Sequence, residues 1–326
     1  MRGKHRRRYL LGLLFLVLLS LLGGDGMDVH AGAVPRSFLY ILQDASIPGI
    51  IASGFGLVVM DYSRDGSDGG AYAPEEIRIL RDHGIIPLEY LSVGEAEDYR
   101  FYWKGDWDGD RDGVPDPGAP AWLGRSNPDW PGNYKVRYWD PGWQEILLSY
   151  LDRILGQEFA GVYLDIIDAF EYWADPGNPE SEVLGLGELA RRMADLILLI
   201  AHRARERVPG FIVVPQNGET ILDSDRGGEL IKAVSGWGVE DLFYWETETT
   251  GFGWRGKRIA YLDRLREKGK LVLVTDYVDD GSGYGGGNLE RIRDFILTAR
   301  RRGYIPYAAR SDRELDEIVI VPGLQP

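Results

Sequence analysis

The stretch GVYLDIIDAF, residues 161–170, decides how the rest of the chain is interpreted. Its β-branched and aromatic run, Val162–Leu164, suits a buried strand. Asp165 and Asp168 follow where that strand would end. Because α/β folds carry their chemistry at the carboxyl ends of parallel strands, both acids are candidate site residues. The alternative is that Asp165 only ends the strand and Asp168 only caps the next helix.

The same strand pattern recurs along the chain, and helical patterns separate most of the repeats. Alternation of this kind predicts a parallel sheet, and eight strands in about 290 residues predict a closed (β/α)8 TIM-type barrel of the α/β class. A doubly wound open sheet is the alternative, but it needs a glycine-rich turn after the first strand, which residues 43–46 lack. The expected strands are residues 38–43, 56–61, 85–91, 161–165, 211–216, 236–240, 271–276 and 304–309, with a long irregular insertion, residues 96–139, after the third.

The N-terminus has the layout of a secretory signal peptide. Five basic residues within positions 2–8 precede an apolar run over residues 9–22, and Ala31–Ala33 offers a small-residue cleavage site. The apolar run is short for a transmembrane helix, although an uncleaved signal anchor is the alternative and would tie the chain to a membrane. We therefore expect residues 1–33 to be a leader and residues 34–326 to be one secreted or extracytoplasmic domain.

Composition excludes several classes of function. The net charge of −14 disfavours nucleic acid and anionic membranes as partners and favours neutral or cationic ligands. The chain has no cysteine, which excludes disulfides and a thiol nucleophile. Its four histidines make a histidine metal site or a Ser-His-Asp triad improbable. Aromatic residues make up 12% of the chain, and such side chains line sugar sites as well as cores.

Polar side chains gather at the expected strand ends, and a barrel would bring them to one mouth. The alternative is that each acid merely caps the following helix. A mouth rich in carboxylates and aromatics, without His or Cys, favours glycoside hydrolysis, which needs one carboxyl to protonate the leaving oxygen and a second to attack or to activate water. Asp165 and Glu240 are the best-placed pair, and no organic cofactor is implied. The strand-end residues are Asp61, Glu95, Asp165, Asp168, Asn217, Glu219, Glu240 and Asp276.

Several longer motifs resemble glycoside hydrolase family 114. They are YLSVGEAEDYRFYW (90–103), WPGNYKVRYWDPGW (130–143), GVYLDIIDAFEYW (161–173), VVPQNGE (213–219), GVEDLFY (238–244) and GYIPYAARSDREL (303–315). The resemblance implies a TIM-type barrel of the endo-α-1,4-polygalactosaminidase type, among extracellular proteins once described as cysteinyl-tRNA synthetase-like. It implies an amino-sugar-containing, cationic polysaccharide as substrate.

The resemblance also assigns roles to residues of the matching motifs. It implies Asp165 and Glu240 as the catalytic carboxylates, and our own expectation is that Asp165 is the nucleophile and Glu240 the acid/base. Candidate sugar contacts in the same motifs are Tyr90, Glu95, Asp168, Asn217 and Tyr244, and position alone adds Asp61, Asp276 and Arg310. The alternative function is a catalytically weak barrel that binds carbohydrate at a cell surface or in a matrix. A metal-dependent esterase or deacetylase is disfavoured by the few histidines.

The insertion contains a separate acidic motif, DWDGDRDGVPD, at residues 106–116. Alternating carboxylates around a glycine turn are typical of Ca²⁺-binding loops, although the twelfth-position Glu of an EF-hand is missing. The expected ligands of a structural Ca²⁺ are Asp108, Asp110, Asp112 and Asp116. The alternative is a solvated acidic loop.

Overall fold

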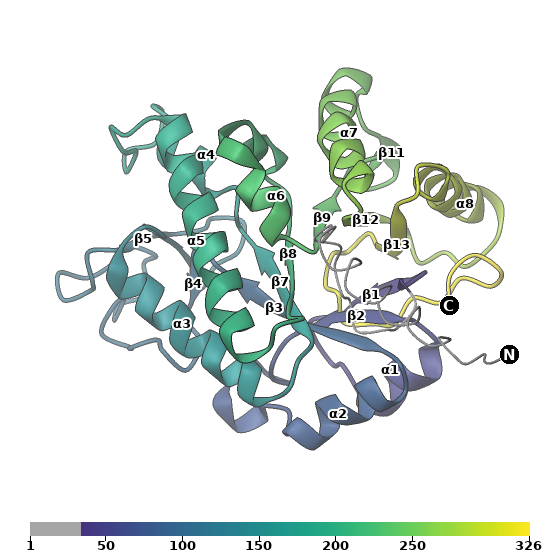
Figure 1. Cartoon of the computed structure of the whole chain (residues 1–326), viewed down its shortest axis with the longest axis horizontal. Coiled ribbons are helices and arrows are strands. Elements are labelled where there is room, and N and C mark those ends of the chain that lie inside the picture. Colours follow the sequence, from purple (N-terminus) through teal and green to yellow (C-terminus); the bar gives the residue numbers. More distant parts are fainter. Residues whose placement is uncertain (1–33) are drawn as a thin grey trace, which may run out of the picture.

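The computed structural model describes residues 34–326, and the expected signal peptide lies outside them. Its centre is a set of parallel strands whose order in space follows their order in the chain, in a five-stranded and a three-stranded sheet (Figure 1). The five-stranded sheet runs β1-β2-β3-β7-β8 and the other runs β13-β12-β9. The strands are β1 (Phe38–Tyr40), β2 (Leu57–Met60), β3 (Ile86–Ser92), β7 (Gly161–Asp165), β8 (Ile212–Pro215), β9 (Gly236–Glu240), β12 (Leu271–Asp279) and β13 (Ile305–Arg310).

The two sheets meet at both of their edges. Between β8 and β9 the backbone of Ser235 donates to Val213 (2.8 Å) and that of Asn217 donates to Gly238 (2.9 Å). At the other edge, the backbone N–H of Leu42, just after β1, donates to the carbonyl of Leu315, which follows β13 (2.8 Å). The TIM-barrel type of fold is therefore confirmed, although the continuous strand ladders stop at these two edges.

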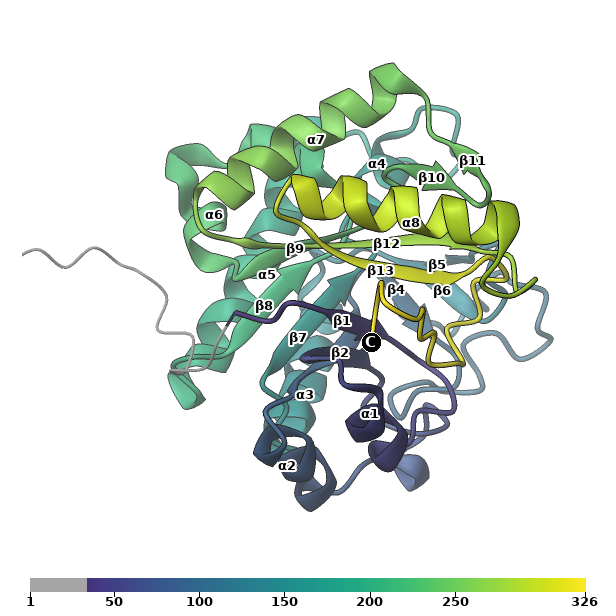
Figure 2. The same cartoon turned by 90° about the vertical axis from the view of Figure 1, so that its right-hand side faces the viewer.

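Helices cover the outside of the strands. Figure 1 shows α3 and α5 beside β3, β7 and β8, and Figure 2 shows α7 and α8 lying over β9, β12 and β13. None of the helices in the described part of the chain is both long and apolar enough to cross a membrane. The helices are α1 (Ile47–Ser53), α2 (Pro74–Asp82), α3 (Pro141–Gly156), α4 (Ala169–Ala174), α5 (Leu186–Arg207), α6 (Glu229–Ala233), α7 (Phe252–Glu267) and α8 (Gly286–Arg301).

Local chemistry explains where the helices begin and end. The side chain of Asp140 accepts the N–H of Gly142 (2.8 Å), and Pro141 occupies the first turn of α3, where its missing N–H costs nothing. Helix α1 was not predicted, yet it carries the same signals. Ser46 caps it by accepting the N–H of Gly49, and Gly54, with a φ of 81°, ends it.

The expected insertion is present and mostly irregular, but it contains three short strands that were not predicted. Residues 95–136 contain an antiparallel sheet in the order β4-β6-β5, made of β4 (Glu95–Glu97), β5 (Leu123–Ser126) and β6 (Asn133–Val136). The turns between these strands are long, which hides the two-residue alternation of a hairpin. Aromatic packing stabilises this sheet against α3, through a row of contacting rings formed by Trp103, Trp107, Trp122, Tyr134 and Trp143.

Candidate active site

Asp165 and Glu240 lie at the carboxyl ends of β7 and β9, and one side chain joins them. The amide nitrogen of Gln216, just after β8, donates to Asp165 Oδ1 (3.1 Å) and to Glu240 Oε2 (2.6 Å). Placed end to end, these bonds keep the two carboxylate oxygens within about 5.7 Å of each other, close to the roughly 5–5.5 Å separation of retaining glycosidases. The predicted pair therefore shares one site.

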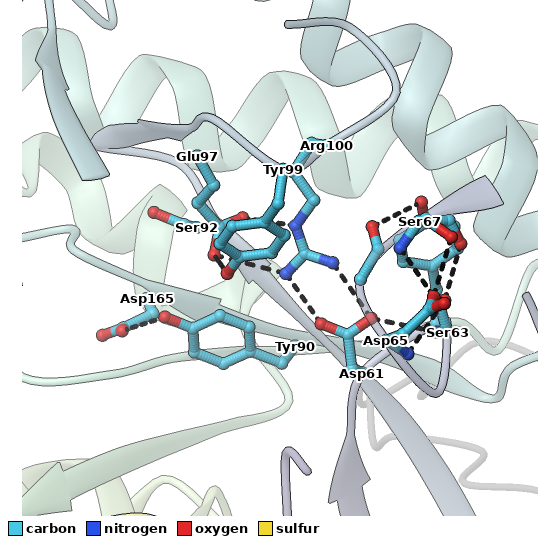
Figure 3. Close-up of polar contacts among 12 residues, drawn as sticks. Asp61, Ser63, Asp65, Ser67, Tyr90, Ser92, Glu97, Tyr99, Arg100 and Asp165 are labelled. Carbon is cyan, nitrogen blue, oxygen red and sulfur yellow. Dashed lines mark hydrogen bonds and ion pairs between the residues drawn. The ribbon is translucent and has the colours of Figure 1, made fainter. Parts of the chain in front are cut away.

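Asp165 is held from the β3 side as well. Its Oδ2 accepts the hydroxyl of Tyr90 (2.6 Å), and Figure 3 shows that hydroxyl pointing at the carboxylate. The backbone then turns sharply at Ile166, whose carbonyl oxygen would lie 2.2 Å from a Cβ on Gly94. Only glycine at position 94 lets the loop that follows β3 pass so close to this turn.

Glu240 has more hydrogen-bond donors than Asp165. Its Oε2 also accepts the amide of Asn217 (3.2 Å), and its Oε1 accepts the hydroxyl of Tyr277. Asn217 is itself fixed, because its Oδ1 accepts the Glu240 N–H (3.0 Å) and the guanidinium of Arg258 (3.1 Å). Arg258 also donates to the Glu240 carbonyl oxygen (2.8 Å) and pairs with Glu219 (2.7 Å). Both the side chain and the backbone of Glu240 are thus locked in place.

The residue that follows each of these site residues has a strained backbone conformation. Ile166 follows Asp165, Asn217 follows Gln216 and Asp241 follows Glu240, with φ values of 56°, 59° and 53°. A left-handed conformation is uncommon outside glycine, and for a β-branched residue such as isoleucine it is a true outlier. Such strain costs about 1–3 kcal/mol per residue and gathers at functional sites. Its repetition around one mouth supports a functional role for this edge of the barrel.

Burial makes both carboxyls weak acids. It raises the pKa of Asp165 to about 8, with the negative charge of Glu240 adding to the shift and the hydrogen bond from Tyr90 opposing it. The pKa of Glu240 is also raised, mainly by burial and against the hydrogen bonds from Tyr277 and Asn217. Both shifts favour the protonated form of a carboxyl in this pair, and glycoside hydrolysis needs one carboxyl that carries a proton.

Asp168 makes no side-chain hydrogen bond or ion pair with residues 34–326. It sits at the N-cap of α4, but its side chain makes no capping bond, so the capping alternative does not hold. Burial raises its pKa to about 6, with Glu171 adding to the shift and Lys135 opposing it. A Cβ on Gly218 would lie 3.2 Å from Asp168 Cβ, which places Asp168 beside the turn that carries Gln216 and Asn217.

Asp61 and Glu95 are engaged elsewhere. The carboxylate of Asp61, after β2, pairs with the buried guanidinium of Arg100 (2.7 Å), which also bonds Glu97 (2.6 Å) (Figure 3). Glu95 is buried, pairs with Lys135 and accepts the amide of Asn127 (2.9 Å). The contacts of both acids thus stabilise the loop after β3 and the insertion rather than Asp165 and Glu240.

Three further residues that were expected to contact sugar make contacts within the protein. Asp276 has no exposed surface, and its oxygens accept the backbone N–H groups of residues 242–244 (2.8–2.9 Å). The hydroxyl of Tyr244 donates to Asp294 of α8 (2.8 Å). Arg310 pairs with Asp279 (2.8 Å) and with Glu317. These contacts join β12, β13 and α8 to the segments around them.

Sequence reasoning missed Tyr277 and Gln216 as site residues. The expected seventh strand stopped at Asp276, whereas β12 continues to Asp279. Because side chains alternate along a strand, Asp276 and Tyr277 face opposite sides, and Tyr277 takes the position that was expected for Asp276. Gln216 is the last residue of the expected strand 211–216. Its position immediately before Asn217, a candidate site residue, could have indicated that it also lies at the mouth.

The acidic loop brings three of its four expected ligands together. Carboxylate oxygens of Asp108, Asp110 and Asp112 lie within 4.8 Å of one another. Asp116 is not in this cluster, and its Oδ2 accepts the N–H of Gly109 (2.7 Å). An all-oxygen donor set suits Ca²⁺, so three of the expected ligands fit the ion.

One family profile and two relatives match most of this chain. The sequence profile of glycoside-hydrolase family GH114 matches residues 28–325. An uncharacterized protein of Thermotoga maritima is 46% identical over 323 residues, covering 98% of this chain and 95% of its own. Uncharacterized protein MJ1477 of Methanocaldococcus jannaschii is 48% identical over 280 residues, covering 86% of this chain and 77% of its own.

Two solved structures share the fold. The glycoside hydrolase domain of PelA from Pseudomonas aeruginosa aligns with a TM-score of 0.60 at 20% identity, covering 88% of this chain and 98% of that one. Ega3 from Aspergillus fumigatus, solved in complex with galactosamine, aligns with a TM-score of 0.64 at 16% identity, covering 92% and 100%. Since the family profile spans all but the first residues and the last, this chain belongs to glycoside-hydrolase family GH114 and is a glycosidase.

Proposed function

We propose that this protein is a secreted, endo-acting glycosidase that cleaves an amino-sugar-containing polysaccharide of the α-1,4-galactosaminidase type, using Asp165 and Glu240. The observation that carries the proposal is the double hydrogen bond from Gln216, which brings the two partly buried carboxyls within reach of one glycosidic bond. Secretion is supported by the leader-like residues 1–33.

The separation of the carboxyls supports a retaining reaction in two steps. In the first step Asp165 attacks the anomeric carbon while protonated Glu240 gives its proton to the leaving oxygen, and a glycosyl ester forms on Asp165. In the second step Glu240, now ionised, takes a proton from water as that water attacks the anomeric carbon and releases Asp165. Tyr90 and Tyr277 steady the two carboxylates through their hydroxyl groups.

A cationic sugar fits the charge of this mouth. Asp165 must be ionised to attack, yet burial and Glu240 hold its pKa near 8. An ammonium group bound close to Asp165 would lower that pKa, because an opposite charge favours the ionised form. Asp168, which lacks a capping bond and stands beside the same turn, is the proposed partner for such a group, together with Asn217. Galactosamine is the sugar found with the structurally similar Ega3.

The direct test is hydrolysis of partly deacetylated α-1,4-galactosaminogalactan by residues 34–326. We expect reducing ends to appear together with mid-sized oligosaccharides, as for an endo-acting enzyme. Proton NMR of the first product is expected to show the α-anomer, because a pair this close favours retention. Binding of the polymer without cleavage would favour the carbohydrate-binding alternative, and a first product in the β configuration would contradict the two-step reaction.

We also propose that Asp108, Asp110 and Asp112 hold a structural Ca²⁺. The three carboxylates converge, and binding to the folded state alone stabilises it by an amount that grows with the logarithm of the ligand excess. A tenfold rise in free Ca²⁺ above its Kd is expected to add about 1.4 kcal/mol of stability. Thermal melts in EDTA and in Ca²⁺ measure the difference, and Asp110→Asn is expected to reduce it. Identical melts in both buffers would contradict the ion site.

A further inference from the structure

The side chain of Gln216 joins the two candidate catalytic carboxyls. It is 1% exposed, and its single amide nitrogen serves both carboxyls of the candidate pair. Its carbonyl oxygen, Oε1, is buried and has no hydrogen-bond partner among residues 34–326. The amide orientation follows from its neighbours, because the reverse orientation would point an acceptor at two other acceptors.

Packing alone does not account for this residue. A buried carbonyl oxygen without a partner is unfavourable, and an apolar side chain of the same length would avoid it. The unfavourable oxygen comes with two donors that no aliphatic residue supplies, and both donors are used on the catalytic candidates. The two hydrogen bonds donated by the nitrogen are therefore what the amide adds over an apolar side chain.

We propose that Gln216 is a positioning residue, which holds Asp165 and Glu240 at one separation and favours a single shared proton between them. The inference rests on the proposed function, since it assigns Gln216 to the same reaction. A donor to an ionised carboxylate stabilises that form. One nitrogen that donates to two carboxylates therefore opposes the uptake of a second proton by the pair, and it ties the position of each carboxylate to that of the other.

Other charged and titratable groups face the pair and are left intact in the test. The hydroxyls of Tyr40, Tyr90, Tyr163 and Tyr277 surround the two carboxyls from β1, β3, β7 and β12. Asp168 lies on the Asp165 side, and Asp241 and Arg313 lie on the Glu240 side. A change confined to Gln216 thus removes two donors and leaves these groups in place.

The test is Gln216→Met, which keeps the length of the side chain and removes both donors. We expect kcat to fall about 100-fold, the loss typical for one preorganised donor, while KM changes much less. We expect both limbs of the pH profile of kcat to move to higher pH by about one unit, because each carboxyl loses a donor to its ionised form. An unchanged kcat and pH profile in a folded variant would overturn the proposal.

Gln157 provides a matched control. It is also buried, its amide nitrogen donates to the backbone carbonyls of Tyr62 (2.9 Å) and Tyr72 (2.8 Å), and its Oε1 also lacks a partner within the described chain. Gln157→Met therefore removes the same chemistry at the end of α3, away from the pair. It is expected to lower the melting temperature and to leave kcat and the pH profile unchanged.

A second variant and a measurement that needs no substrate also test the positioning role of Gln216. Gln216→Asn keeps the amide but is one methylene too short to span both carboxyls, so an intermediate loss is expected. Infrared titration of the carboxyls, with Asp165→Asn and Glu240→Gln to assign the bands, needs no substrate. It is expected to show both steps moved upward in Gln216→Met. Unmoved steps would sink the positioning role, whereas failure of wild type to cleave the polymer would count only against the proposed function.

Discussion

Asp165→Asn and Glu240→Gln are each expected to lower the rate of polysaccharide cleavage by at least ~100-fold, the scale of a positioned proton transfer or nucleophile. Both changes keep the size of the side chain and its hydrogen bond with Gln216, so the loss reports chemistry rather than packing. Reducing-end release at saturating substrate, with circular dichroism of each variant, measures the effect. Glu145→Gln, which changes an exposed acid on α3, is the matched control and should retain full activity.

Azide separates the two roles. In Asp165→Ala azide can replace the missing nucleophile directly, which gives a glycosyl azide of inverted configuration. In Glu240→Ala azide attacks the glycosyl ester on Asp165, which gives the retained configuration. The opposite pattern would exchange the two roles, an outcome consistent with the larger number of donors around Glu240. Cleavage retained by both amide variants would remove the pair from the reaction.

The strands and the pair could be predicted from the sequence because the signal is local. A parallel strand buried on both faces is a continuous apolar run, and the first polar residue after it marks the mouth. Asp165 and Glu240 satisfy this rule directly, since β7 and β9 end on them. The rule failed at Asp276, because this polar residue lies inside β12 and not at its end. The strand continues to Asp279 through the buried residues Tyr277 and Val278.

The contacts around the pair were less predictable because they join residues far apart in the chain. Arg258 reaches Glu240 from α7, and Arg313 reaches Asp241 from beyond β13 (2.7 Å). Nothing in a helical pattern marks one arginine among several as inward-facing. The same holds for Arg100, whose partner Asp61 is 39 residues away.

Arg100→Met is expected to be among the most destabilising single changes in this barrel. Arg100 is buried, bonds Asp61 and Glu97, and lies over the ring of Tyr99 (4.8 Å). Removing one partner of a buried ion pair leaves uncompensated charge and typically costs about 3–5 kcal/mol. Urea unfolding of the wild type and the variant measures the loss. Arg78→Met, which breaks a solvent-exposed pair with Glu158, is the matched control and should change stability little.

The stability lost in Arg100→Met should increase as the pH rises. Burial raises the pKa of Asp61 and Arg100 opposes the shift, so removing Arg100 raises that pKa further. Glu89 faces the same cluster without a hydrogen-bond partner in the described chain, and burial raises its pKa well above the usual range. A carboxyl whose folded pKa exceeds its unfolded value binds its proton more tightly in the folded state, so stability falls as pH rises between the two values.

Arg100→Met is therefore expected to lose more stability near pH 8 than near pH 5, because Asp61 takes up a proton at the lower value. Asp61→Asn in the same background should recover part of the loss at the higher pH, since it removes the stranded charge and keeps the shape. Equal losses at both pH values, with no recovery in the double variant, would mean that packing against the tyrosines, rather than buried charge, is what Arg100 supplies.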